Sequence, residues 1–122
     1  MALGPVRRFT QSLVQALRLP RTAERIVDLL ARSRRQLSVK EIVARVRMSE
    51  RSVRGNLALL LRRGILERQP VVTGRRRLAY RYRLRPAEDL LREVASHFAR
   101  NLRLLKDAAR RVSPRNDASG RS

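Results

Sequence analysis

Apolar residues recur every three or four positions through the first third of the chain, a spacing that predicts amphipathic helices. In residues 6–17 the repeat comprises Val6, Phe9, Leu13 and Leu17. Pro5 suits the first turn of that helix, and Pro20 ends the segment. A second helix is expected from about Thr22, which is a plausible N-cap. Its buried stripe is predicted to be Ala23, Ile26, Val27 and Leu30.

The segment LSVKEI (residues 37–42) contains a strong helix-start signal. Ser38 and Glu41 have the spacing of a capping box, in which each side chain bonds a backbone N–H that the helix leaves unpaired. Leu37 and Ile42 occupy the two positions of a hydrophobic staple. A short helix over residues 39–46 follows from these signals.

A second start signal, MSERSV, comes only a few residues later. Ser49 is the expected N-cap of a fourth helix, which runs to Arg63 and ends at Gly64. Two short capped helices joined by a tight turn make a helix-turn-helix.

The apolar period changes to two after the fourth helix. Leu78, Tyr80, Tyr82 and Leu84 alternate with arginines, which predicts a half-buried strand. Residues 65–69 are expected to be its antiparallel partner, with a loop near Thr73 and Gly74. Pro70 confines that partner to a sheet edge, or ends it, because proline donates no backbone hydrogen bond.

Pro86 opens the longest predicted helix, residues 87–112, whose apolar positions follow a heptad pattern. A two-stranded coiled coil with a second subunit would bury this stripe, and Asn101 would set its register. The expected dimerisation residues are Leu91, Val94, Phe98, Asn101 and Leu105. The alternative is that this helix folds back on the N-terminal helix of the same chain. Residues 113–122 read as a disordered tail.

The charge of the chain is extreme, with 30 basic and 10 acidic residues in 122 and a net charge of +20. Such an excess repels itself in a compact chain and favours a polyanionic partner. Nucleic acid is the first expectation and an anionic membrane surface the second. All basic residues except Lys40 and Lys106 are arginine, which suits bidentate contacts to phosphate and guanine. Genomic base composition is an equally good explanation of that bias.

In residues 22–84, three predicted helices are followed by a two-stranded hairpin with a basic loop at its tip. This order of elements resembles the winged helix-turn-helix family. Within it, SERSVRGNLALLLRRGILER (residues 49–68) is similar to the recognition helix and first wing strand of small MarR, ArsR and TrmB-like regulators. The flanking helices resemble, more loosely, the dimerisation arms of small archaeal members. The resemblance implies a mainly α fold with a small β-hairpin, a winged helix-turn-helix flanked by an N-terminal helix and a long C-terminal dimerisation helix. Because such folds also bind RNA or proteins, the fold alone does not establish DNA binding.

The fourth predicted helix, from Ser49 to Arg63, has two chemically distinct faces. If Val53, Leu57, Leu60 and Leu61 are buried, the opposite side of the helix carries small and basic side chains. The expected DNA contacts of this helix are Ser49, Arg51, Ser52, Arg54, Gly55, Ala58 and Arg62. Gly55 would cost about 1 kcal/mol in a helix interior, which a close approach to the wall of a major groove explains. Close packing against another helix of the same protein is the alternative.

Three consecutive arginines, Arg75, Arg76 and Arg77, stand beside the predicted wing tip. Three arginines in a row are more than solubility requires, so a minor groove or adjacent phosphates would attract them, and a solvated loop is the alternative. Residues 51–85 contain eleven arginines and one acid, so half of the net charge falls in 35 residues. Ser38 and Lys40, at a helix N-terminus, are further candidate phosphate contacts.

Other classes of function lack the residues they need. The chain has no cysteine, one histidine, no paired carboxylates at working spacing and no glycine-rich phosphate loop. We therefore expect no enzyme activity, no metal, no cofactor and no membrane partner. An amphipathic N-terminus rich in arginine also fits an organelle transit peptide, but the bracketing prolines favour an ordinary helix.

These observations predict a homodimeric transcriptional regulator that binds specific double-stranded DNA in the cytoplasm, associated with the nucleoid. Its layout would be an N-terminal arm (1–20), a winged helix-turn-helix (21–85), a dimerisation helix (86–112) and the tail. Architectural DNA binding with little sequence preference is the alternative in the same class. A structural RNA-binding protein of ribosomal type is the alternative from another class.

Overall fold

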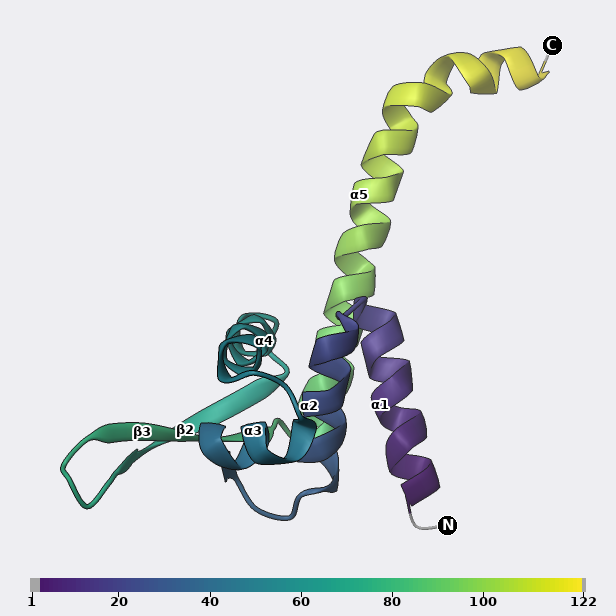
Figure 1. The fold of residues 1–122 in the computed structure, drawn as a ribbon. Coiled ribbons are helices and arrows are strands. Elements are labelled where there is room, and N and C mark those ends of the chain that lie inside the picture. The colour runs from purple at the N-terminus through teal and green to yellow at the C-terminus, as the bar shows by residue number, and fades with distance from the viewer. Residues whose placement is uncertain (1–2, 122) are drawn as a thin grey trace.

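The computed structural model describes the backbone of residues 3–121 and the side chains of residues 4–112. This part of the chain forms five helices and a three-stranded antiparallel sheet (Figure 1). In chain order the elements are α1 (Leu3–Leu17), α2 (Arg21–Arg32), β1 (Leu37–Ser38), α3 (Val39–Val46), α4 (Glu50–Arg62), β2 (Leu66–Val72), β3 (Leu78–Leu84) and α5 (Ala87–Arg121). The predicted fold class, mainly α with a small β-hairpin, is confirmed.

The core lies where α2 meets α1, α3, α4 and the base of the sheet. The stripe predicted for α2 is buried completely at Ala23, Ile26 and Val27. Because this stripe recurs at helical spacing, one face of α2 is covered while its arginines remain outside. The helix-turn-helix is thus built around α2.

The starts of α3 and α4 follow the sequence signals. Ser38 and Glu41 form the complete capping box, with both of its hydrogen bonds present, and Ser49 Oγ accepts from the Ser52 N–H. The expected cap at Thr22 is wrong, because α2 begins one residue earlier, after Pro20, with no side-chain cap. Thr22 instead donates its hydroxyl hydrogen to Asn56 Oδ1 of α4 at 3.1 Å.

The sheet has the strand order β1-β3-β2, and the two-residue β1 was not predicted. Its Leu37 is fully buried and pairs with Tyr82 of β3. Two residues carry no periodicity, so only the tertiary contact shows this strand. β2 is longer than expected and continues through Pro70, which pairs with Tyr80. Proline is tolerated there because β2 is an edge strand, as its position predicts.

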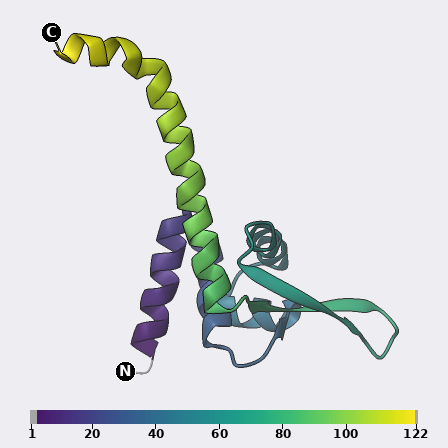
Figure 2. The same cartoon turned by 180° about the vertical axis from the view of Figure 1, so that it is seen from behind.

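α5 rises away from the body, and α1 lies beside only its first part (Figures 1 and 2). Leu90 is 1% exposed and Val94 packs on the core, whereas the apolar side chains from Phe98 to Val112 are exposed. The backbone stays helical to Arg121, past the predicted end at Val112. A helix can continue through Pro114 with a kink, because proline removes one hydrogen bond without reversing the chain. Disorder of the tail remains a prediction.

Candidate nucleic-acid interface

The two faces of α4 differ in burial as the sequence predicts. Val53, Leu57 and Leu60 are buried in the core, while Leu61 is half-buried and packs against it. The outward residues Arg51, Arg54, Gly55, Ala58 and Arg62 are all exposed. Ser49 is exposed and Ser52 half-buried, and both take part in the local hydrogen bonds of the first turns.

Gly55 lies on this outward face with open space beside it. A Cβ atom built on Gly55 meets nothing within 4 Å. No helix of the described chain therefore packs against this glycine, so close packing within the chain does not explain it.

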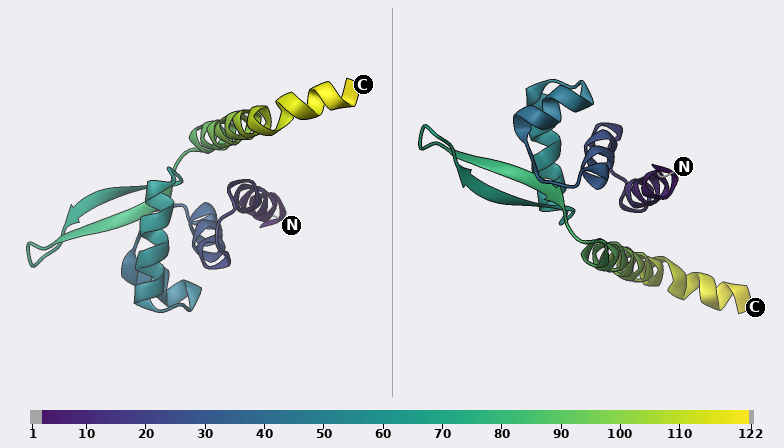
Figure 3. Two further views of the ribbon diagram at one scale, coloured as in Figure 1. Left: turned by 90° about the horizontal axis from the view of Figure 1, so that it is seen from above. Right: turned by 90° about the horizontal axis from the view of Figure 1, so that it is seen from below.

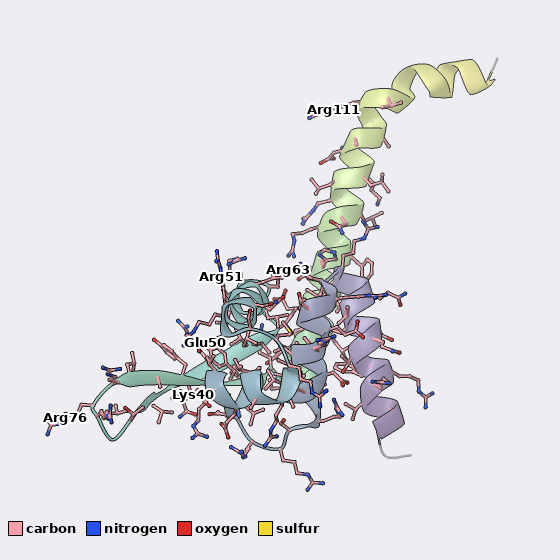
Figure 4. The ribbon with its side chains drawn as sticks, in the orientation of Figure 1. Lys40, Glu50, Arg51, Arg63, Arg76 and Arg111 are labelled. Atoms are coloured by element: carbon pink, nitrogen blue, oxygen red, sulfur yellow. The ribbon has the colours of Figure 1, made fainter. Side chains whose placement is uncertain are left out.

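The arginines of this face are available to an external anion. Arg54 Nε donates to Glu50 Oε2 at 2.8 Å, but both side chains are more than half exposed. Such a pair contributes about 0–1 kcal/mol, so a phosphate can replace the carboxylate at little cost. Among the described residues, Arg51 and Arg62 have no ion-pair or hydrogen-bond partner. Figure 4 shows Arg51 projecting away from the body of the protein.

Arg75, Arg76 and Arg77 form the turn between β2 and β3, at the tip of the hairpin, and all are exposed. The Thr73 N–H donates to the Arg77 carbonyl at 3.0 Å, and the Arg76 N–H donates to the Thr73 carbonyl at 2.9 Å. Arg76 has a positive φ of 57°. These bonds close the turn, and Figure 4 shows Arg76 at the outermost point of the hairpin.

Ser38 and Lys40 are less suited to contact DNA together with the α4 face than the other candidate residues are. The Ser38 hydroxyl is occupied by the capping box, whereas Lys40 is exposed. In the view of Figure 4, Lys40 and Arg51 lie at opposite edges of the helix pair α3–α4. The structure therefore groups the α4 face by itself and leaves Lys40 apart from it.

Glu41 caps α3 and also contacts the loop before β1 and the strand β3. Its carboxylate accepts from the Ser38 N–H at 2.9 Å and lies 2.7 Å from Arg35 and 3.9 Å from Arg81 of β3. The backbone hydrogen bond from Ser38, and then the bond from Arg35, lower the pKa of Glu41 from 4.5 to about 2. The ionised carboxylate therefore ties the loop before β1 to α3 and the sheet.

Two arginines that the sequence did not single out fasten the end of α4 to the flanking helices. Arg63 Nη2 donates to the carbonyl of Leu17, the last residue of α1, at 2.7 Å. Arg85 Nη1 donates to the Gly64 carbonyl at 2.8 Å, and its guanidinium lies 3.7–3.8 Å from the carboxylates of Asp89 and Glu93 of α5. The spacing of Arg85 to the two acids was a usable signal. No spacing links Arg63 to Leu17.

Gly64 makes this junction possible. It has a φ of +74°, and the Gly64 and Ile65 N–H groups donate to the Leu61 and Leu60 carbonyls, which is a Schellman ending. A Cβ on Gly64 would lie 2.9 Å from the Glu93 carboxyl group. Glycine is therefore favoured by the left-handed backbone conformation, and a Cβ would in addition require the end of the Glu93 side chain to shift.

The five residues predicted for dimerisation lie along α5 with different environments. Leu91, Phe98 and Leu105 are exposed, whereas Val94 is half-buried against the core of its own chain. Asn101 is exposed, and its Nδ2 lies 3.0 Å from His97 Nε2. Beyond its contact with α1, the described apolar stripe of α5 is uncovered in the single chain.

Residues 3–121 contain no helix that is both long and apolar enough to cross a membrane. In the same described part of the chain, no three side chains of the metal-binding types come together.

Comparison with solved structures finds transcriptional regulators. A possible transcriptional regulator from Methanosarcina mazei Go1 superposes with a TM-score of 0.61 at 16% identity, covering 80% of this chain and 86% of that one. A second transcriptional regulator gives 0.65 at 21% identity, covering 93% and 77%. A mutant of Staphylococcus aureus MepR, bound to an oligodeoxyribonucleotide, gives 0.50 at 13% identity, covering 97% and 91%. No protein-family model and no curated protein matches the sequence.

The shared feature of these structures is the fold. With α2, α3 and α4 around one core and the β2–β3 hairpin as a wing, this chain has the winged helix-turn-helix fold of MarR-type transcriptional regulators. At these identities the likeness extends to the fold alone.

Proposed function

We propose that this protein is a homodimeric transcriptional regulator that binds specific double-stranded DNA, with α4 in the major groove. The observation that carries the proposal is the outward face of α4. The side chains of this face are either basic or small, and its Gly55 has no packing partner in the described chain. A helix that enters a major groove needs both properties, because its backbone approaches the groove walls and its side chains face phosphates and base edges.

Individual roles follow from position on α4. Arg51 lies in the first turn, the part of a recognition helix that usually reaches base edges, and a guanidinium can bind guanine O6 and N7 together. Arg54 would exchange Glu50 for a phosphate or base, and Arg62 would bind the backbone at the other end. Gly55 and Ala58 would leave room for the groove wall. Ser49 and Ser52 would contribute hydroxyl contacts at the helix start.

The wing would contact DNA beside α4. Seen from above, the hairpin and α5 extend in opposite directions from α4 (Figure 3). The tip arginines 75–77 would reach a neighbouring minor groove or its phosphates while α4 occupies the major groove. Lys40 and the N-terminus of α3 would at most add a phosphate contact at the margin.

A second copy of the chain would cover the exposed stripe of α5. Leu91, Phe98 and Leu105 lie on one side of the helix, and a coiled-coil pairing would bury them, with Asn101 setting the register. Two copies would present two α4 helices to one duplex, which favours a pseudo-palindromic site. Arg63 and Arg85 would hold each α4 at a set angle to this stem. Such a regulator would act in the cytoplasm, associated with the nucleoid.

Support for DNA as the partner comes from the solved relatives as well as from the charge. Several are transcriptional regulators, and the MepR mutant holds an oligodeoxyribonucleotide. The identities are low, so the role of each residue rests on the geometry of this chain.

The test is selection of binding sites from a pool of random duplexes, followed by affinities for the selected site, a random duplex and a structured RNA across salt concentrations. We expect preference for the selected site. Equal affinity for both duplexes would favour architectural binding, and preference for RNA would favour an RNA-binding role.

Variants then test whether the outward face of α4 contacts the bases. Arg51→Ala should relax the preference at particular base positions, with a loss of about 1–3 kcal/mol for the selected site. Arg8→Ala, which removes the same charge from an exposed position on α1, is the control and should keep the preference. An unchanged site preference in Arg51→Ala would show that the residues that contact the bases lie elsewhere.

A further inference from the structure

The outer end of the wing exposes two apolar side chains next to its arginines. Val72 is the last residue of β2 and Leu78 the first of β3, and the two are direct cross-strand partners. Their exposed fractions are 71% and 63%, whereas Tyr82, on the same face of β3 near the base, is 6% exposed. We call Val72 and Leu78 the tip pair.

The tip pair continues a mainly apolar face that begins in the core and carries one charged residue, Arg68, whose guanidinium lies 3.9 Å from the centre of the Tyr80 ring. Along β3 the side chains of Tyr82, Tyr80 and Leu78 point to one side of the hairpin, and Pro70 and Val72 pair with the last two. Burial falls steadily toward the tip, where the described chain offers nothing to cover the face. An apolar cross-strand pair that is exposed at the end of a hairpin favours contact with a partner.

The surroundings of the tip pair are strongly cationic. Residues 68–83 contain six arginines and no acid. The three tip arginines lie in the same turn as Thr73 and Gly74, and backbone hydrogen bonds close this turn. An apolar pair in such a ring of positive charge is complementary to a surface that is anionic at its edges and apolar within.

We propose that the tip pair enters the minor groove of duplex DNA, contacts its sugar walls and opens a base step, so that the bound duplex is kinked. In the minor groove, apolar side chains that press between base steps unstack them and bend the duplex toward the major groove. The adjacent arginines hold the phosphates on each side. This inference rests on the proposed function, because the wing reaches this groove when α4 occupies the neighbouring major groove.

A second copy of the chain is the competing occupant, and the charge disfavours it. Two wing tips placed face to face would bring twelve arginines together, counting six from each copy. Duplex DNA satisfies the apolar and the cationic parts of the tip at once.

The experiment compares three proteins on the selected duplex, labelled at both ends for energy transfer. We expect the wild-type protein to shorten the end-to-end distance. The variant Val72→Ser with Leu78→Ser should bind about tenfold more weakly and leave the duplex nearly straight. Its salt slope should be unchanged, because the lost contact is apolar. Gln69→Ser, on the opposite face of the hairpin, is the control and should match the wild-type protein.

A triple replacement of the tip arginines 75–77 by alanine separates the two kinds of contact. It should reduce the slope of log affinity against log salt by about 0.9 for each phosphate contact that is lost. The bend should persist at low salt.

The outcomes separate this inference from the function beneath it. If the wild-type protein binds no duplex, the proposed function fails. If it binds, but the double serine variant keeps the affinity and the bend, the tip pair is not in the groove. If that variant changes the oligomeric state in sedimentation, the tip pair joins copies of the chain, and the inference is overturned. Both side chains are exposed, so circular dichroism should confirm a normal fold.

Discussion

The dipeptide Arg-Gly occurs twice, within α4 at Arg54–Gly55 and at the end of α4 at Arg63–Gly64. In the second pair, the guanidinium bonds a carbonyl of α1, and the glycine has a positive φ and lies against Glu93. In the first pair, the glycine lies mid-helix with open space around it, and the arginine has only an exposed carboxylate as partner.

The comparison teaches which residues the fold requires. Arg63 and Gly64 are explained by contacts within the chain, so their contribution to the free energy of unfolding should be large. Gly55 weakens the helix and receives nothing from the described chain in return. A groove wall that approaches Gly55 in a DNA complex would account for this residue, and the proposed interface is therefore placed on that side of α4.

The largest effect is expected at the second pair. Gly64→Ala forces a Cβ into the left-handed region and toward Glu93, and should lower the free energy of unfolding by about 2 kcal/mol. Urea denaturation followed by circular dichroism measures it. A loss below about 0.5 kcal/mol would show that the junction relaxes easily.

Arg63→Ala should have the next largest effect. It removes a charge-assisted hydrogen bond to the end of α1 and should lower the free energy of unfolding by about 1.5 kcal/mol. Arg51→Ala is the matched change on the open face and should stay within about 0.5 kcal/mol of the wild-type value. Equal losses in the two variants would remove the distinction between the pairs.

Gly55→Ala should shift stability the other way. Alanine is the better helix former, so the free energy of unfolding should rise by about 0.8 kcal/mol in chemical denaturation. Affinity for the selected duplex should fall, because the added methyl group occupies the space that the groove wall would take in the proposed complex. A variant that is more stable and binds as tightly would show that Gly55 has no role in approach to DNA.

The smallest effect is expected at Glu41, which belongs to neither pair, because the side chains of its partners Arg35 and Arg81 are 57% and 44% exposed and solvent weakens these ion pairs. Its pKa is lowered in the folded state, so the unfolded chain binds more protons between about pH 4.5 and about pH 2. The stabilisation is present above pH 4.5 and is lost as the pH falls through that interval. Thermal unfolding at several pH values should show this, and Glu41→Gln should flatten the dependence there. An unchanged slope in the variant would assign it to other carboxylates.

The sequence predicted those parts of the structure that local chemistry decides. The capping box at Ser38, the cap at Ser49 and the ending at Gly64 each depend on residues within one helical turn, and all three are present. The buried face of α4 followed from periodicity in the same way. Thr22 misled the prediction because a threonine before an apolar stripe suits a cap, whereas Pro20 already sets the start of α2.

The parts that sequence did not predict depend on contacts far along the chain. β1 exists because Leu37 meets Tyr82, and Arg63 reaches Leu17 across 46 positions. Neither pairing leaves a periodic trace. The period-two pattern of β3 predicted one buried face, but it did not show that burial ends before Leu78, because the reach of the core along the hairpin depends on α2, α3 and α4.

The central claim is that the outward face of α4 lies against duplex DNA, and the absence of cysteine from the chain allows a direct test. Ala58→Cys places a single thiol on that face, and Ser12→Cys places one at an exposed position on α1. With saturating selected duplex, alkylation of the thiol at position 58 should slow at least tenfold, and alkylation at position 12 should keep its rate. If the thiol at position 58 reacts as fast with bound DNA as without it, the account is contradicted.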